Sequence, residues 1–513
     1  MEDRSLAVAY PNMSIRPFSR GFRFAAACMM LLAGPACETT TPGNLGGKPP
    51  GASPAPSLFL GEYEVTDGSQ GHVTGDSPNP ELSMMVRIDN GLFFIYRANH
   101  GLLPPRIYVR RFDLATNTFG RAVMVDELTD TAVAGYHSQP SLFRDGSGRL
   151  HVLTIYTPQK NLCFNSDGIA PRHRMIGDLS NPAAWSPVGC LRTRETNIWG
   201  YPGQRAQIYD FMGVYDALTG VSHIVGEGSG IWQLDGRALR GIPRTYFRIP
   251  PSGVPDGPYA LTDPVHDEPP EHPPGGNIFT KGDLVVGREP TAPRSLHLVW
   301  NIRNTWTDGA GFHQWNYNLY YARSRDGGQT WQPVSGSASV ATVDRIPWND
   351  PRFLAVAGDI AQDSERAFDV DTESRPFLVY MRRRAGTGRQ YGRYVDAEKE
   401  PFPTYDLAWQ RWDGSRWVGG TIDTSRNWQF SRPKIRIAQD NAVYVFLGDP
   451  PRYLVSRDRG LTWEREVWFG NQSDYGWRLY SYSDPIDFNN HFIAYQNRNT
   501  HRLYFSRLRL TNR

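Results

Sequence analysis

The sequence predicts an all-β fold, a single β-propeller of seven blades with Asp-box turns, over residues 57–513. Three observations lead to this prediction. The 513-residue chain contains 50 Gly and 40 Pro, and 12% of its residues are aromatic. This mixture favours short strands and tight turns over long helices. In addition, one strand unit recurs along the chain, and two copies of the unit end in the same hairpin-turn pattern.

The recurring unit is a polar turn followed by a short aromatic or β-branched strand. The seven copies span 90–96, 148–153, 220–225, 294–300, 375–380, 441–446 and 490–495. A partner strand is predicted after each copy, at 107–112, 172–176, 231–234, 319–323, 407–411, 453–456 and 503–507. Seven units give roughly 65 residues each, enough for a four-stranded blade with long loops. A β-sandwich or two smaller β domains is the alternative, but no linker-like composition interrupts 57–513.

Two hairpin turns carry the pattern S-x-D-x-G-x-T-W, in which Ser and Asp bond the turn backbone, Gly permits positive φ and Trp packs beneath. The first copy consists of Ser324, Asp326, Gly328, Thr330 and Trp331, and the second of Ser456, Asp458, Gly460, Thr462 and Trp463. The pattern resembles the Asp-box of BNR (bacterial neuraminidase repeat) propellers. In that class the motif is structural, so we assign these residues no catalytic role.

The order of segments also resembles the ulvan-lyase-like polysaccharide lyases within the BNR class. The segments that carry the resemblance are 136–145 with 150–152, 201–202, 296–303 with 318–324, 358–376 and 432–433. They span most of 130–465. The resemblance implies a catalytic His at His137 and a catalytic Tyr at Tyr201. The family's second His and its Arg have no counterpart, because they would fall near Tyr156 and Ala217.

These residue types suit β-elimination of a uronic-acid polymer. A cation beside the carboxylate stabilises the enolate that develops, and a His or Tyr within hydrogen-bond reach moves the proton. For binding the substrate we single out Arg205, Arg248, Arg303 and Trp306. Trp306 lies in a predicted Gly-rich loop and would either stack on a sugar or pack within a hairpin.

Two other functions remain open. The unmatched lyase positions leave a non-catalytic propeller that binds glycans or acts as a surface scaffold. A sialidase-like glycoside hydrolase is the third candidate, because 247–250 read Phe-Arg-Ile-Pro and the Arg of that sialidase motif binds a carboxylate. Interpreting Arg248 as part of an ordinary blade strand is simpler, since the motif lies late in the chain. The repeated positions of His151, His223 and His297 mark them as scaffold residues.

The N-terminal region predicts export. Arg16, Arg20 and Arg23 precede an apolar run over 24–36, which is typical of a signal peptide. The segment 1–37 resembles a bacterial lipoprotein signal with Cys37 as the lipidated residue. Gly34 stands where that pattern has Leu, so an ordinary secretory signal is the alternative. Residues 38–56 form a predicted disordered tether.

The remaining cysteines and the charge limit the possible partners. Cys163 and Cys190 form a predicted disulfide, which an oxidising compartment permits. A net charge of +3 gives no reason to expect nucleic acid. We expect an extracytoplasmic monomer, free or anchored to the outer membrane by lipid, whose partner is a polysaccharide or glycan, anionic in the lyase case. No nucleotide-binding or metal-ligand spacing is present, so we predict no cofactor and assign no metal site.

Overall fold

The computed structural model describes 58–66, 72–73, 83–99, 106–127, 140–154, 164–165, 168–169, 171–191, 206–229, 232–234, 237–239, 241–242, 244–262, 277–308, 311–361, 367–387, 404–425, 427, 432–448, 451–468, 479–497 and 499–510. The chain divides into two units, 1–45 and 46–513, and every described residue belongs to the second. The predicted signal peptide with Cys37 and the predicted tether therefore lie outside the described residues.

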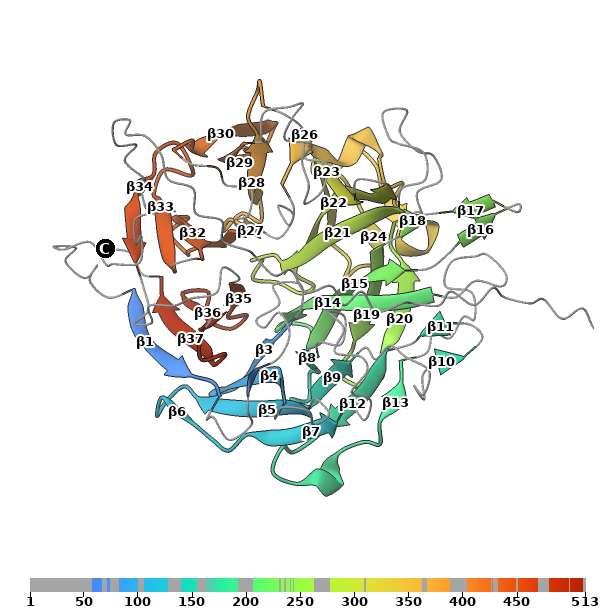
Figure 1. Ribbon diagram of the computed structural model, residues 1–513, viewed down its shortest axis with the longest axis vertical. Helices are drawn as coiled ribbons and strands as arrows, with labels where there is room; N and C mark the ends of the chain where they lie inside the picture. Colours follow the sequence, from blue (N-terminus) through green and yellow to red (C-terminus); the bar gives the residue numbers. More distant parts are fainter. Residues whose placement is uncertain are drawn as a thin grey trace, which may run out of the picture. The chain divides into compact units, whose positions relative to one another are not determined.

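The described residues form an all-β structure in a propeller arrangement, with sheets around a common centre that are antiparallel except where β11 meets β14 and β18 meets β21 (Figure 1). Their only helices are the short 3-10 turns η2 (Pro182–Ala184), η3 (Thr342–Asp344) and η4 (Pro351–Phe353). No helix in this part of the chain has the length and apolar character needed to cross a membrane.

The sheets follow one another in sequence order. The first contains β3 (Met85–Ile88), β4 (Gly91–Asn99), β5 (Arg106–Asp113) and β7 (Val123–Glu127), with β2 (His72–Val73) and β6 (Thr118–Phe119) beside them. The second contains β8 (Ser141–Arg144), β9 (Leu150–Thr154), β12 (Arg172–Ile176) and β13 (Gly189–Cys190). The third contains β14 (Ala206–Asp216), β15 (Val221–Ser229), β19 (Arg244–Ile249) and β20 (Asp256–Ala260), with β10 (Phe164–Asn165) and β11 (Gly168–Ile169) at one edge.

The next sheet is the largest. It contains β18 (Gly241–Ile242), β21 (Asn277–Val286), β22 (Leu296–Asp308), β23 (Gly311–Ser324), β26 (Leu354–Ile360), β27 (Phe368–Val370), β28 (Pro376–Arg383), β29 (Tyr405–Trp412) and β30 (Trp417–Asp423). It is followed by β31 (Lys434–Ile437), β32 (Val443–Leu447), β33 (Arg452–Ser456) and β34 (Glu464–Trp468). Two small ribbons pair β16 (Trp232–Leu234) with β17 (Arg237–Leu239) and β24 (Thr330–Trp331) with β25 (Val340–Ala341).

The last sheet joins the two ends of the described chain. It contains β35 (Tyr480–Ser483), β36 (Asn490–Gln496), β37 (Leu503–Arg509) and β1 (Phe59–Glu64). β1 pairs antiparallel with β37, so that Glu62 lies opposite Ser506. Figure 1 shows the blue β1 beside the red β37. The pairing closes the ring and leaves fewer free strand edges than an open sheet would.

Six of the seven predicted strand pairs are confirmed as antiparallel neighbours. They are β4 with β5, β9 with β12, β22 with β23, β28 with β29, β32 with β33, and β36 with β37. The seventh prediction is wrong, because residues 232–234 form the ribbon β16–β17 and β15 pairs with β19 instead. The preference for β19 has a packing reason, since Tyr246, Phe247 and Ile249 are all buried.

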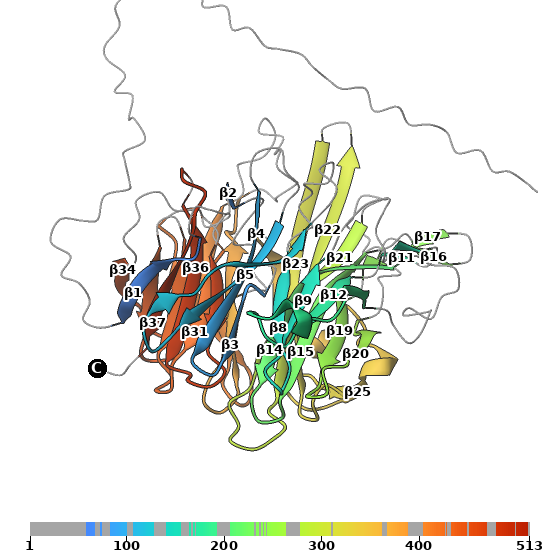
Figure 2. The same cartoon turned by 90° about the horizontal axis from the view of Figure 1, so that it is seen from below.

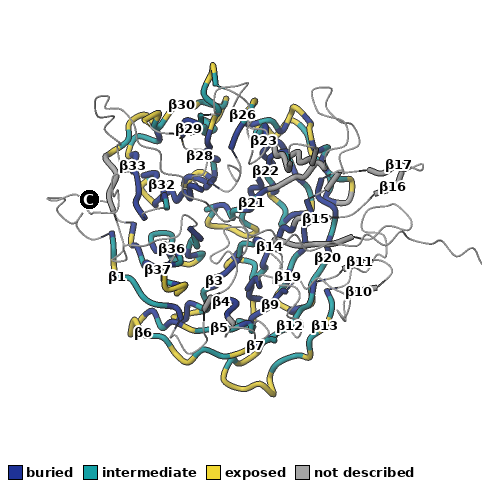
Figure 3. The backbone as a smooth tube through the Cα atoms, viewed as in Figure 1, coloured by how far each residue is buried: buried dark blue, intermediate teal, exposed yellow. Residues whose placement is uncertain are grey.

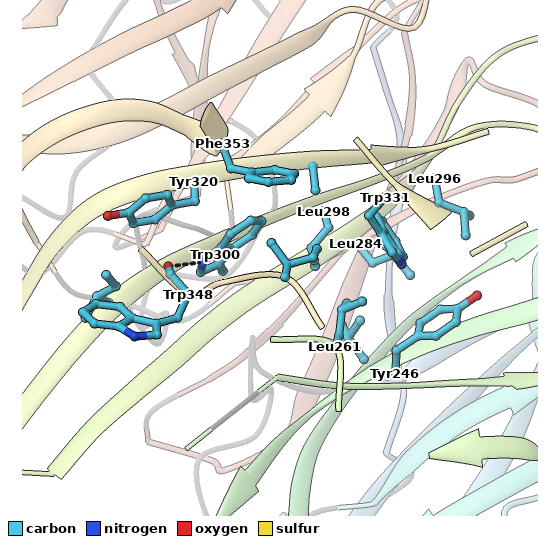
Figure 4. Close-up of a cluster of buried hydrophobic side chains, with 14 of the residues drawn as sticks. Tyr246, Leu261, Leu284, Leu296, Leu298, Trp300, Tyr320, Trp331, Trp348 and Phe353 are labelled. Atoms are coloured by element: carbon cyan, nitrogen blue, oxygen red, sulfur yellow. Dashed lines mark hydrogen bonds between the residues drawn. The ribbon is translucent and has the colours of Figure 1, made fainter. Parts of the chain in front are cut away.

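The hydrophobic core is distributed between neighbouring sheets. One cluster packs Tyr246 and Leu261 against Leu284 and Trp300 of the following sheet and against Trp331 of the ribbon β24–β25 (Figure 4). The strand interiors are buried, whereas many of the turns between strands are exposed (Figure 3). Because each sheet buries its faces against two neighbours, the ring is stabilised as a whole.

The inner strands lie nearest the centre and give the structure two distinct ends (Figure 1); they are β3, β8, β14, β21, β27, β31 and β35. We call the end where these inner strands begin the loop face, and the end where they turn into the second strand the turn face. Turns of different sheets bond one another at the turn face: Arg288 Nη1 donates to the backbone carbonyl of Ala438 at 3.2 Å, and Asn489 Nδ2 donates to Gln439 Oε1 at 3.2 Å. β22 and β23 extend beyond their neighbours in Figure 2.

The two predicted Asp-box turns contain the hydrogen bonds that their pattern implies. Asp326 Oδ1 accepts from the backbone N–H of Thr330 at 2.9 Å, and Ser324 Oγ accepts from Gly328 N–H at 2.9 Å. Asp458 and Ser456 make the equivalent bonds in the second turn. Gly328 and Gly460 have φ of +86° and +97°. These residues therefore hold turns, which agrees with their exclusion from the predicted site.

Candidate functional site

The predicted catalytic residues His137 and Tyr201 both lie outside the described residues, as does Arg205. Their position in the chain is still informative. His137 precedes the first residue of β8, Ser141, by four positions, and Tyr201 precedes the first residue of β14, Ala206, by five. Both residues therefore precede inner strands in the sequence.

Hydrogen bonds join Ser83 and the beginning of β8 to the middle of β14. Ser141 Oγ donates to the carbonyl of Phe211 in β14 at 3.1 Å. Ser83, just before β3, links both strands, because its carbonyl accepts from Leu142 N–H at 2.7 Å and its Oγ accepts from Gly213 N–H at 2.9 Å. β8 and β14 are therefore direct neighbours around the centre.

The inner strands enclose a central cavity of about 130 Å³. Its wall includes residues of β14, β21, β27, β31 and β35, together with Ser83. Three acidic and three basic side chains face it, namely Asp283, Asp369, Asp484, Arg294, Lys434 and Arg436. A cavity with both charge signs and several hydroxyl groups is suited to a polar ligand.

Two tyrosines in the cavity wall have altered acidity. Burial raises the pKa of Tyr480 and of Tyr482 above the ordinary phenol value. Tyr482 Oη accepts from the backbone N–H of Arg87 at 2.9 Å. A phenol with a raised pKa keeps its proton at neutral pH, so these side chains can donate a proton or a hydrogen bond but are poor bases.

Near the turn face, the cavity wall contains a buried ion pair. Arg87 Nη1 bonds Asp484 Oδ2, whose side chain is fully buried. Asp484 Oδ1 also accepts from the backbone N–H groups of Ile486 and Asp487, at 2.9 and 3.1 Å. The carboxylate thus fixes both the cation and the turn that follows β35.

Arg248 lies in β19, as the blade-strand interpretation predicts. Its guanidinium bonds Asp256 Oδ2 in β20, with Nε at 3.1 Å, and Nη1 lies 3.5 Å from Gly327 O in the Asp-box turn. Arg248 is not among the residues that line the described cavity. Its charge is already matched by a carboxylate of its own sheet, and the proposed role in substrate binding stays a prediction.

Arg303 and Trp306 both lie in β22, near the loop-face end of that strand. The side chain of Arg303 is partly exposed, whereas the structure describes only the backbone of Trp306. The predicted loop around Trp306 is wrong, because β22 and β23 remain paired as far as Asp308 and Gly311. Alternating aromatic and Thr residues favour a strand there. Contact of Arg303 or Trp306 with substrate stays a prediction.

The three recurring histidines are confirmed as scaffold residues. His151, His223 and His297 are buried in the second strands of their sheets. Each bonds an aromatic side chain of the third strand, at distances of 2.9, 2.7 and 2.6 Å. Cys190 in β13 is disulfide-bonded. Its predicted partner, Cys163, lies outside the described residues, so that pairing stays a prediction.

Sequence reasoning missed the charged residues of the cavity. Asp369, Lys434 and Arg436 are buried in short inner strands. A signal for them exists, because charged residues there alternate with apolar ones in strands of three and four residues that precede the recurring polar turn. Within the described residues, no group of three His, Cys, Asp or Glu side chains is arranged to hold a metal ion.

No family model matches the sequence, and no curated protein matches it. Among solved structures, the polysaccharide lyase Uly1 has a similar fold, with a TM-score of 0.61, 11% identity, and coverage of 88% of this chain and 100% of that chain. The Hadza microbial sialidase Hz136 aligns with a TM-score of 0.37, 14% identity and coverage of 80% and 74%. A mutant of NanB sialidase from Streptococcus pneumoniae aligns with a TM-score of 0.31, 10% identity, and coverage of 88% of this chain and 98% of that chain. The likeness to Uly1 shows a shared propeller fold over most of the chain.

Proposed function

We propose that this protein is a carbohydrate-interacting propeller of the BNR class, and that its loop face cleaves a uronic-acid polysaccharide by β-elimination. The observation that carries the proposal is the direct contact between β8 and β14, through Ser141 Oγ and Phe211 O. The two segments that lead into these strands contain His137 and Tyr201. The fold shared with a polysaccharide lyase is consistent with this proposal.

The proposed chemistry follows from the residue types. Tyr201 or His137 removes the proton at C5 of the uronate, and the other residue protonates the leaving glycosidic oxygen. The electron pair of the broken C–H bond forms the new double bond as the C–O bond breaks. A cation beside the carboxylate stabilises the intermediate charge. Arg205 and Arg303 are the proposed sources of that cation.

We also infer that the propeller has seven blades. The nine-stranded sheet joins β26 to β28 through one residue pair, Ile360 with Arg382. This link separates two groups of four strands. One group consists of β21, β22, β23 and β26, and the other of β27, β28, β29 and β30. Counting these groups as separate blades, with the sheets that begin at β3, β8, β14, β31 and β35, gives the proposed seven.

The test is ultraviolet absorbance of unsaturated uronates while the purified protein is mixed with ulvan, pectin, alginate or a glycosaminoglycan. We expect absorbance to rise with at least one polymer. The rise should be lost in His137→Ala and reduced about a hundredfold or more in Tyr201→Phe, because each variant removes a proton-transfer group. Arg416→Ala is the matched control, since the Arg416 side chain is 80% exposed.

A flat trace with every polymer, from protein whose folding is verified by circular dichroism, would contradict the lyase proposal. Binding of the same polymers without cleavage would then identify the non-catalytic alternative. Full activity in both His137→Ala and Tyr201→Phe would contradict the assignment of these residues even if the protein is a lyase.

We further propose that the protein is exported to the cell envelope. The disulfide at Cys190 supports this proposal, because disulfides persist in oxidising compartments. Fractionation of cells that express the full chain should place it in the envelope, and Cys37→Ser should release it in soluble form. An unchanged envelope fraction for Cys37→Ser would contradict lipidation.

A further inference from the structure

Three arginines surround one aromatic ring at the turn face. The guanidinium carbons of Arg288, Arg294 and Arg436 lie 5.3, 5.3 and 5.4 Å from the centroid of the Phe488 ring. The residues come from three different sheets: Arg288 and Arg294 from the turn between β21 and β22, Arg436 from β31, and Phe488 from the turn after β35. We call these four residues the arginine cluster.

Among the described residues, the guanidinium groups of the arginine cluster bond a single carboxylate, that of Asp369. Asp369 Oδ2 accepts from both Arg288 Nη2 at 3.0 Å and Arg436 Nη1 at 3.3 Å, so one carboxylate serves two cations. Asp484, the other acid at this end of the cavity, is already bonded to Arg87.

In the described part of the chain, the guanidinium of Arg294 bonds backbone carbonyls, whereas its backbone N–H donates to Asp216 Oδ2 at 3.4 Å. Its Nε donates to the carbonyl of Glu289 at 3.2 Å, and its Nη1 lies 3.5 Å from the carbonyl of Pro485. The carboxylate of Glu289 bonds Ser295 instead. Among the described residues, Arg288 and Arg436 therefore share one carboxylate, and the guanidinium of Arg294 bonds none.

Two donors of the cluster are also unused. The side chains of Arg288 and Arg436 are each 4% exposed. The Nε atom of each is buried and has no hydrogen-bond partner among the described residues. Burial lowers the pKa of Arg288 to about 10. A buried cation with an unused donor is unfavourable unless a ligand supplies charge and acceptors.

A space for such a ligand adjoins the cluster. Arg294, Arg436 and Phe488 all line the central cavity of about 130 Å³. A water molecule occupies about 30 Å³ in the liquid, so the cavity can hold an anion larger than a single water. Guanidinium groups match carboxylate, sulfate and phosphate oxygens with paired N–H donors. Asp283, Asp369, Asp484 and Lys434 also line the cavity.

We propose that the turn-face end of the central cavity binds a small oxyanion through Arg294 and Arg436. The ligand is either a free inorganic anion, such as sulfate, or the carboxylate of a small uronate sugar. This site is separate from the proposed catalytic residues, because Arg294 and Phe488 follow the ends of inner strands whereas His137 and Tyr201 precede their beginnings.

The experiment is isothermal titration of the full protein with sodium sulfate and, separately, with glucuronate, at constant ionic strength set by chloride. We expect saturable one-to-one binding of at least one anion. Arg294→Gln should weaken it by about tenfold or more, since one charged hydrogen-bond partner is lost. Arg416→Gln, at an exposed position on a different turn, should bind as the unmodified protein does.

The sulfate and glucuronate titrations distinguish the two kinds of ligand. Preference for sulfate indicates an inorganic anion, whereas preference for glucuronate indicates a sugar carboxylate. His137→Ala should bind the anion with unchanged affinity, so loss of lyase activity and loss of anion binding are separate outcomes. Absence of saturable binding for both anions, or equal binding by Arg294→Gln, would overturn the proposal. Arg294 is less buried than Arg436. Thermal unfolding of Arg294→Gln verifies that this variant is folded.

Discussion

His151 Nδ1 lies 2.9 Å from His173 Nε2, and the two rings stack with their centroids 5.1 Å apart. The same side-chain contact recurs in the next two sheets with a tyrosine in place of the second histidine, with ring centroids 6.1 and 6.0 Å apart. Tyr246 bonds His223, and Tyr321 bonds His297. In all three sheets the partner stands two residues before the residue paired with the histidine. His173 is therefore the titratable member of an otherwise phenolic set.

We predict that this difference makes stability depend on pH. Burial lowers the pKa of His173 to about 4 and those of His223 and His297 to about 3. Below about pH 6.5 the unfolded chain binds protons at these side chains that the folded protein does not, so stability falls as pH falls. The loss of unfolding free energy that His173 causes develops as the pH falls from 6.5 to about 4, and it reaches roughly 3 kcal/mol. Above pH 6.5 His173 has no influence.

The substitution His173→Tyr should keep the bond to His151 and reduce this loss, as urea denaturation at pH 7, 5.5 and 4.5 would measure. Tyr321→His makes the reverse exchange in another sheet and should increase the loss. An identical pH dependence for His173→Tyr and the unmodified protein would show that His173 does not carry the effect.

Two adjacent glycines of the first Asp-box turn provide a matched comparison. Gly327 and Gly328 both have positive φ, +68° and +86°. A Cβ on Gly328 would lie 2.0 Å from Tyr246 Oη, whereas a Cβ on Gly327 would have no atom within 4 Å. We expect Gly327→Ala to cost about 1 kcal/mol of unfolding free energy, from backbone strain alone. Gly328→Ala should cost about 3 kcal/mol or more, because Tyr246 is buried and must move.

The midpoint of urea denaturation measures both changes. Equal losses in the two variants would mean that Tyr246 yields without cost. A smaller loss in Gly328→Ala than in Gly327→Ala would contradict the packing of Tyr246 beneath this turn.

The second and third strands, counted outward from each inner strand, could be predicted from sequence. They alternate in polarity or carry aromatic residues next to polar turns. β4 with β5 and β36 with β37 are examples, and their pairing is local in the chain. The pairing of β15 with β19 could not be predicted, since the ribbon β16–β17 intervenes and offers a nearer strand-like segment. Polarity patterns say that a segment forms a strand, but not which strand it contacts.

The cavity was harder to predict for a different reason. Asp369, Arg436 and Phe488 come from separate sheets and meet only when the ring closes. Inner strands such as β31 are buried on both faces, so they show no alternation that would identify the side facing the centre. His137 and Tyr201 were proposed through a family resemblance, because nothing in their local sequence distinguishes them.

The ion pair of Arg87 and Asp484 should contribute strongly to the stability of the ring, because it joins β3 to the last sheet. The side chains are 13% and 0% exposed. Asp484→Asn retains an oxygen for Ile486 and Asp487 but removes the charge, leaving Arg87 without its carboxylate. We expect a loss of about 3 kcal/mol in unfolding free energy, since a largely buried cation remains.

Glu127→Gln is the control. It breaks a pair with Arg106 in which both side chains are 37% exposed, and it should barely move the urea midpoint. Similar midpoints for the two variants would mean that water reaches Arg87 and that closure of the ring depends on the β1–β37 pairing instead.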